Sequence, residues 1–251
     1  MNSEDTPLRS IRRAFARRSL LRGGFAGAVA LGGAGLAAAP ASAAPSPASA
    51  PRGTAARPTT AAEALKELAA GNRRWRTFRE RHPDETPAVR QSLTKGQHPF
   101  AVVLGCIDSR VPPELVFDQG LGDLMTVRTA GEVLDEAVLG SIAYGVLELG
   151  IPLVVVLGHQ SCGAVKAAVQ ADLSGEPLPA HIQYLADQIA PTIDRTQDGD
   201  ARIDATIDAN IRAVRSRLAG EPDLAERIAT GKLAVVGARY ELTNQLVHRI
   251  V

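Results

Sequence analysis

Apolar residues gather in several short runs, separated by polar segments and by segments rich in glycine and proline. The runs at 100–105, 153–157 and 233–237 are nearly continuous and lack the alternation that marks a strand with one solvated face. We therefore expect three strands that are covered on both faces. A fourth run, at 125–128, has a weaker pattern and indicates a further strand.

Apolar residues elsewhere recur at helical spacing. Thr60 and Glu63 have the form of a capping box at the start of an amphipathic helix, and the apolar positions of 134–146 repeat every four residues. Residues 161–171 and 203–218 also have a helical pattern. The order strand, helix, strand predicts a parallel sheet with a right-handed crossover. We expect an α/β fold whose mainly parallel sheet is flanked by helices.

The composition supports one globular domain behind an N-terminal extension. The chain has 251 residues, of which 45% are hydrophobic and 22% charged, and its 28 basic residues nearly balance its 27 acidic ones. This balance gives no support to a nucleic-acid-binding protein or to an acidic disordered chain. Residues 44–58 contain four prolines and no large apolar side chain, which predicts a flexible linker. We expect a single domain over residues 59–251.

The first 43 residues have the pattern of a cleavable export signal. Residues 1–43 carry six arginines and two acidic residues, and their apolar stretch at 23–39 is rich in glycine and alanine. The segment 17–21 (Arg-Arg-Ser-Leu-Leu) resembles a twin-arginine signal, and 41–43 (Ala-Ser-Ala) resembles a cleavage site. The apolar stretch is too short and too glycine-rich for a spanning helix. We expect export by the twin-arginine machinery to the cell envelope or the medium.

The two cysteines of the chain follow its two clearest strands. Cys106 comes directly after the first of them, and His159 and Cys162 follow the second. The carboxyl ends of parallel strands share one edge, where open α/β sheets bind ligands. Two thiolates and one imidazole suit tetrahedral zinc (Zn2+) and leave its fourth position open. A disulfide between Cys106 and Cys162, or two inert buried thiols, are the alternatives.

Asp108 and Arg110 extend the motif that begins at Cys106. Side chains two apart in an extended chain point the same way, so Asp108 should face the same crevice as Cys106. Asp108 can take the fourth zinc position, or it can pair with Arg110 and leave that position to water. In the second arrangement zinc would lower the pKa of the water toward about 7 and supply hydroxide at neutral pH. Asp108 would then accept the hydrogen bond of that hydroxide.

Two motifs of this chain resemble the paired signature of the β-class carbonic anhydrases. They are residues 106–110 (Cys-Ile-Asp-Ser-Arg) and residues 158–163 (Gly-His-Gln-Ser-Cys-Gly). The resemblance spans about residues 60–251, and it includes Gln97 and the segment 123–131. It implies the α/β fold of that family and its reaction, the reversible hydration of carbon dioxide to bicarbonate and a proton.

By this resemblance, zinc is bound by Cys106, His159 and Cys162, and the pair formed by Asp108 and Arg110 is catalytic. Asp108 could instead take the fourth zinc position in a closed state of the site. The two arrangements derived above for Asp108 therefore both remain open at the level of the sequence.

The resemblance further implies a binding role for Gln97 and Gly163, with Gln97 reaching substrate across a dimer interface. We therefore expect a homodimer or a dimer of dimers. Members of the family that are regulated by bicarbonate have Trp where this chain has Val103, although Arg128 and Tyr144 match the other two positions of their regulatory pocket. A complete regulatory site is not expected.

Three other functions compete with zinc-dependent hydration of carbon dioxide. A hydrolase of carbonyl sulfide or carbon disulfide would use the same site. A non-catalytic zinc-binding envelope module would keep Asp108 permanently on the metal, but such a module has no need of Arg110 to draw the carboxylate away. A redox protein would cycle Cys106 and Cys162 between dithiol and disulfide.

Two further groups of side chains have structural interpretations. Glu132, Asp135 and Glu136 are expected to form the solvated first turn of a helix. Trp75 and Phe78 are expected to pack the first helix onto the body of the domain or onto a second subunit.

Overall fold

A computed structural model describes residues 57–251. The export signal expected over 1–43 lies outside the described residues, as does almost all of the linker expected over 44–58. Among the described residues, no helix is long and apolar enough to cross a membrane.

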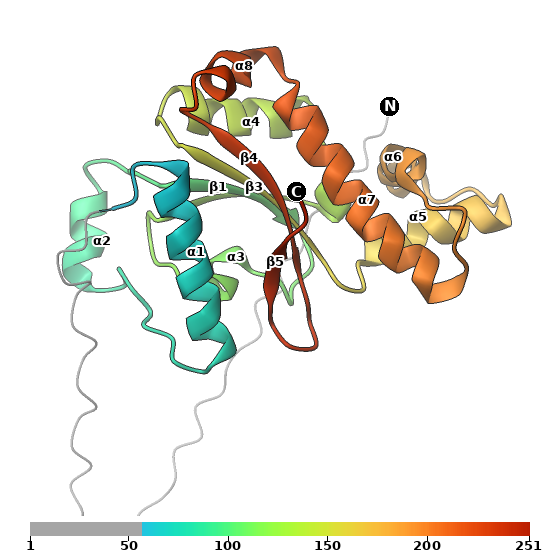
Figure 1. The fold of residues 1–251 in the computed structure, drawn as a ribbon, viewed down its shortest axis with the longest axis horizontal. Coiled ribbons are helices and arrows are strands. Elements are labelled where there is room, and N and C mark those ends of the chain that lie inside the picture. The colour runs from blue at the N-terminus through green and yellow to red at the C-terminus, as the bar shows by residue number, and fades with distance from the viewer. Residues whose placement is uncertain (1–56) are drawn as a thin grey trace, which may run out of the picture. The chain divides into compact units, whose positions relative to one another are not determined.

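The centre of the domain is a five-stranded sheet with the strand order β2-β1-β3-β4-β5. The first four strands in the chain run parallel, and the last is antiparallel to its neighbour β4 (Figure 1). The strands are β1 (Ala101–Cys106), β2 (Leu124–Thr129), β3 (Leu153–His159), β4 (Ala234–Tyr240) and β5 (Val247–Arg249). The expected α/β fold with a mainly parallel sheet is confirmed.

Helices cover both faces of this sheet. On one face, α1 and α3 contribute buried apolar residues to the core, and on the other face α4, α5, α6, α7 and α8 do so. The helices are α1 (Ala61–Arg76), α2 (Pro87–Leu93), α3 (Pro113–Val116), α4 (Glu136–Leu147), α5 (Gly163–Ser174), α6 (Ala180–Ile189), α7 (Gly199–Ala219) and α8 (Pro222–Ala229). Two short 3-10 turns, η1 (Ala130–Glu132) and η2 (Ala190–Thr192), complete the structure of the described residues.

The strands alternate their side chains between the two cores. In β1, Val102 and Leu104 pack among the residues of α4 to α8, whereas Ala101 and Val103 pack on the side of α1. Because neither face meets solvent, all six residues of β1 and all seven of β3 are buried. This explains why apolar runs without alternation predicted these strands correctly.

The first helix begins where its capping box predicts. The Thr60 side chain accepts a hydrogen bond from the Glu63 amide, and the Glu63 carboxylate accepts one from the Thr60 amide. Further along α1, the Trp75 indole donates a hydrogen bond of 3.1 Å to the Tyr240 hydroxyl. Trp75 thus packs the helix onto the sheet as expected, whereas Phe78 is 85% exposed in the described part of the chain.

The direction in which the chain adds strands to the sheet reverses at β1, and this reversal positions the site. From β1 the chain moves outward to β2 and then returns through α4 to β3, on the other side of β1. Neighbouring strands whose connections leave in opposite directions open a crevice at their carboxyl ends. That crevice lies between the ends of β1 and β3.

Candidate metal centre

Three potential metal ligands meet in the crevice between β1 and β3. Cys106 is the last residue of β1, His159 is the last residue of β3, and Cys162 is the N-cap of α5. All three side chains are buried, and their ligand atoms all lie within 4.8 Å of one another. Cys106, His159 and Cys162 are thus brought together in space from two distant parts of the sequence.

The His159 ring is oriented by a single hydrogen bond. Its Nδ1 lies 2.8 Å from the carbonyl oxygen of Gln160, and because a carbonyl only accepts, Nδ1 carries the proton. The lone pair therefore resides on Nε2. This buried atom has no hydrogen-bond partner among the described residues. Histidines that bind a metal through one ring nitrogen typically donate a hydrogen bond from the other. His159 has this arrangement, with Nδ1 bonded to the backbone and Nε2 free to bind a metal.

The two sulfur atoms lie 4.0 Å apart, and both cysteines are free. A disulfide requires a separation of about 2 Å, so the disulfide alternative is wrong for this structure. The Cys162 thiol beside it, together with His159 and the Gly131 amide, lowers the pKa of Cys106 to about 4. The same contact between the thiols raises the pKa of Cys162, because the pair retains one proton. A divalent cation bound between the sulfurs would replace that proton.

Arg110 holds both oxygens of the Asp108 carboxylate. The guanidinium donates hydrogen bonds of 2.9 Å and 2.7 Å from Nε and Nη2, and the Arg110 amide adds a third of 2.9 Å. These bonds lower the pKa of Asp108 to about 2. The nearer oxygen lies 3.9 Å from His159 Nε2. The carboxylate therefore sits beside the three ligands as a fixed anion, with Arg110 on its other side.

Arg128 holds the backbone of the same motif. It donates from Nε to the Cys106 carbonyl (2.8 Å) and from Nη2 to the Asp108 carbonyl (2.7 Å). A guanidinium fork that joins both carbonyls restricts the turn that separates the cysteine from the aspartate. Arg128 thereby restrains the backbone that positions two side chains of the site.

Comparison with known proteins identifies the family of this domain. Residues 101–247 match the carbonic anhydrase family. Carbonic anhydrase 2 of Mycobacterium tuberculosis is 45% identical over 188 residues, which cover 74% of this chain and 91% of the relative. A solved structure, the β-carbonic anhydrase CcaA, is 25% identical, with a TM-score of 0.60 over 74% of this chain and 94% of that one. The chain belongs to the β-class carbonic anhydrases.

Other relatives agree with this placement. The carbonic anhydrase of Mycolicibacterium smegmatis is 43% identical over 183 residues, which cover 72% of this chain and 89% of the relative. The β-carbonic anhydrase CafA of Aspergillus fumigatus, at 22% identity, has the same fold with a TM-score of 0.61 over 74% of this chain and 89% of that one. The family and the enzyme class expected from the two motifs are confirmed.

Gln97 lies away from the three ligands within one chain of this β-class enzyme. It is exposed and precedes β1, whose other end carries Cys106. Six strand residues separate the two ends by about 17 Å at roughly 3.3 Å per residue. Gly163, by contrast, directly follows Cys162 as the first residue of α5, and no atom lies within 4 Å of the place where its Cβ would be. The crevice is therefore open beside Gly163.

The three positions compared with a regulatory pocket do not meet in this carbonic anhydrase. Arg128 and Tyr144 line one cavity of about 660 Å³ beside β2 and α4. Val103 is not among its lining residues, because this side chain is fully buried on the opposite face of the sheet. Two of the three compared positions therefore line one cavity, and the third belongs to the core on the other face of the sheet.

Glu132 corrects one expectation about the acidic residues near α4. Asp135 caps that helix and Glu136 lies in its first turn, but Glu132 is 2% exposed and lies in the turn η1. Its Oε1 has no hydrogen-bond partner among the described residues. Burial, with the negative Cys106 nearby, raises the pKa of this carboxyl well above its usual range. Sequence pattern missed this group, because nothing in it distinguishes a buried glutamate from a solvated one.

Proposed function

We propose that Cys106, His159 and Cys162 bind zinc and that the chain hydrates carbon dioxide reversibly to bicarbonate and a proton. The donor set fits the ion. Tetrahedral zinc with bonds of about 2.3 Å to sulfur places two thiolates about 3.8 Å apart, close to the 4.0 Å between these sulfurs. Two thiolates and a neutral imidazole also cancel the charge of a divalent cation.

The observation that carries this proposal is the unpartnered Nε2 of His159. A buried nitrogen without a hydrogen bond is unfavourable by about 1–3 kcal/mol, and the Gln160 carbonyl prevents the ring from being satisfied by the other tautomer. A cation held jointly with Cys106 and Cys162 removes this deficit. When bound, zinc acts as a Lewis acid that lets water serve as a nucleophile near neutral pH.

In this proposal Asp108 and Arg110 control access to the fourth metal position. Arg110 donates hydrogen bonds to both carboxylate oxygens of Asp108 and so holds this carboxylate away from the metal position. Asp108 remains close enough to accept a hydrogen bond from the attacking hydroxyl and to aim its lone pair at carbon dioxide. Without Arg110, the carboxylate would be free to close the site as a fourth ligand.

We also propose that a second copy of the chain completes the site. Gln97 is the expected substrate-binding residue, and it lies at the wrong end of β1 to reach the metal of its own chain. A homodimer that brings Gln97 to the partner's crevice, beside Gly163, resolves this separation. The solved β-carbonic anhydrases of Sordaria macrospora are described as tetrameric, which agrees with a dimer of dimers.

Export by the twin-arginine machinery remains our proposal for the N-terminal segment. It rests on the sequence of residues 1–43. Cell fractionation of the full chain and of an Arg17→Lys, Arg18→Lys variant would test it. We expect the wild type outside the cytoplasm and the variant retained inside, and equal distribution of the two would contradict export by this route.

The decisive experiment is stopped-flow hydration of carbon dioxide by the purified protein with its zinc content measured. Wild type and Asp108→Asn are compared from mildly acidic to alkaline pH. Fast turnover that rises with pH and is lost in the variant supports the proposal. One zinc per chain without turnover would instead favour a closed zinc module, and turnover only with carbonyl sulfide or carbon disulfide would favour a hydrolase.

A further inference from the structure

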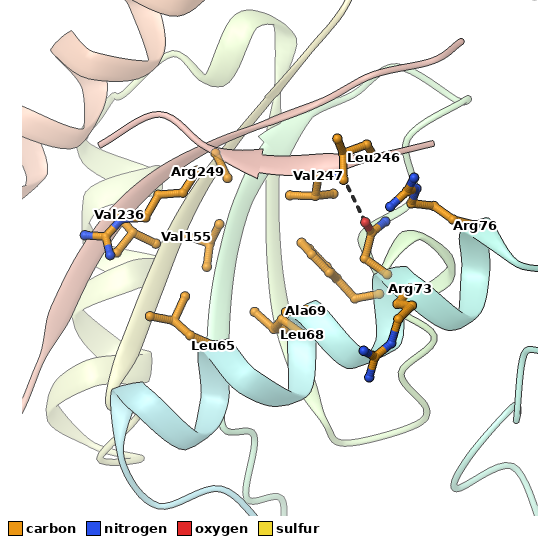
Figure 2. Close-up of a pocket in the computed structure, with 13 residues that line it drawn as sticks. Leu65, Leu68, Ala69, Arg73, Arg76, Val155, Val236, Leu246, Val247 and Arg249 are labelled. Atoms are coloured by element: carbon orange, nitrogen blue, oxygen red, sulfur yellow. Dashed lines mark hydrogen bonds between the residues drawn. The ribbon is translucent and has the colours of Figure 1, made fainter. Parts of the chain in front are cut away.

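An apolar cavity of about 290 Å³ lies on the face of the sheet that is covered by α1. Figure 2 shows Leu65 and Leu68 of α1 along one side, Val155 and Val236 of the sheet behind them, and Val247 of β5 on the other side. Its volume is close to the lower end of the range of small-molecule pockets, about 300 Å³. The cavity is therefore large enough for a short aliphatic chain or one aromatic ring.

Three arginines also line this apolar cavity. Arg73 and Arg76 come from α1 and Arg249 comes from β5, whereas no aspartate or glutamate lines the cavity. Between residues 57 and 251, none of the three forms an ion pair. Arg76 donates only to the Asn244 carbonyl. An apolar interior with unneutralised cations around it is complementary to a ligand that has an apolar body and an anionic head.

A purely structural explanation accounts for part of this arrangement. Arg73 and Arg76 belong to the last turn of α1, where cations stabilise the negative end of the helix dipole. Arg249 is not on a helix, and its side chain lines the cavity from the opposite wall. The helix dipole therefore does not explain why three positive charges from two separate elements surround one apolar space.

We propose that this cavity binds a small amphipathic carboxylate, with its hydrocarbon body against Leu68 and Val155 and its carboxylate on the Arg249 guanidinium. This site is separate from the metal centre. Val155 precedes His159 by four positions in β3, which is about 13 Å along the strand. Cys106 and Cys162 belong to the core on the opposite face of the sheet.

The chain contains its own reporter for such binding. Trp75 is its single tryptophan, and it lies on α1, hydrogen-bonded to Tyr240 two residues beyond the lining residue Ala238. We therefore propose titrating the zinc-loaded protein with octanoate, following Trp75 fluorescence and heat of binding. We expect one saturable site per chain, with affinity rising about fourfold for each methylene from butanoate to octanoate.

Two matched pairs of variants test the location. Ala69→Phe fills the cavity from an exposed position of α1, and Ala62→Phe places the same ring on an exposed position of α1 that does not line it. Arg249→Gln removes a charge from the cavity, and Arg79→Gln removes one elsewhere. We expect Ala69→Phe to abolish binding, Arg249→Gln to weaken it about tenfold, and the other two variants to bind like the wild type.

Three results would overturn the proposal. The first is no saturable binding of octanoate, and the second is equal binding of octylammonium, which would indicate an apolar surface without selectivity for an anion. The third is a change in oligomeric state on Ala69→Phe in sedimentation velocity, without octanoate binding to the wild type. In that case a second copy of the chain would be the occupant of the cavity.

Discussion

Ile211 of α7 lies directly against the backbone of Gly158, the residue before His159. A Cβ at position 158 would lie 2.6 Å from Ile211 Cδ1, and one at Gly237 in the neighbouring strand would lie 2.7 Å from Ile211 Cγ2. The two glycines therefore form the space into which this fully buried isoleucine packs. This close contact between α7 and the sheet lies directly behind the end of the strand that carries His159.

Gly158→Ala should destabilise the protein by about 1–3 kcal/mol, because the added methyl group overlaps Ile211. It should also weaken zinc binding, because the strain falls one residue from His159. Urea unfolding and zinc titration measure the two effects. Gly140→Ala is the control, since no atom lies within 4 Å of its Cβ position. Ile211→Ala should be less harmful in the Gly158→Ala background than alone, and simple additivity would contradict the overlap.

Cys162→Ala should lose stoichiometric zinc and lower the free energy of unfolding. It leaves Cys106 and His159 as two ligands for an ion that requires at least three from the protein, and binding energy at such a site is partly folding energy. Metal analysis of the purified variant, with urea unfolding in the presence and absence of chelator, checks both effects. A variant that retains one zinc per chain would rule out Cys162 as a ligand.

Arg110→Ala should retain zinc but lose turnover by about 100-fold, because Asp108 is then free to move onto the metal. Stopped-flow hydration with parallel metal analysis separates the two quantities. Arg110→Lys is the informative companion, since lysine keeps the charge but cannot bond both carboxylate oxygens as a fork. We expect it to be intermediate in turnover. A zinc-replete Arg110→Ala protein with full activity would exclude the gating role.

Glu132→Gln should become increasingly stable relative to the wild type as the pH rises. The folded pKa of Glu132 lies above its unfolded value of 4.5, so the folded state holds a proton that the unfolded state releases. Its contribution is therefore fully present below pH 4.5 and decreases as the pH rises toward the folded pKa. Glutamine has no proton to lose. Urea midpoints measured from acidic to alkaline pH in excess zinc give this difference in stability, and Glu136→Gln is the exposed control. A difference between Glu132→Gln and wild type that did not change with pH would contradict the prediction.

Much of the fold was predictable because its strands are buried on both faces. Continuous apolar runs and the helical repeats between them place β1, β3 and β4 and the helices α1, α4 and α7 correctly. The position of the site follows from the same signal. Since Cys106 and His159 come at the ends of parallel strands, their approach is a consequence of topology and does not depend on side-chain detail.

The remaining features depend on contacts that leave little trace in a pattern. The strand β5 has three residues, too few for a periodicity, and it exists through its pairing with β4. The helices α2, α6 and α8 are short, and prolines stand at or beside their starts. The burial of Glu132 depends on the conformation of η1, in which Gly131 has a positive φ. The hydrogen bonds from Arg110 to both oxygens of Asp108 are likewise a contact that the motif alone does not specify.

The positions of the two cysteines have a consequence for the mechanics of the chain. Cys106 and Cys162 are 56 positions apart, and the segment between them contains β2, α4 and β3. An ion bound by both sulfurs would close this segment into a loop, as a disulfide would. Closing a loop of that length lowers the entropy of the unfolded chain by the equivalent of about 4 kcal/mol. Unlike a disulfide, such a tie needs no oxidant, and a chelator rather than a reductant would release it.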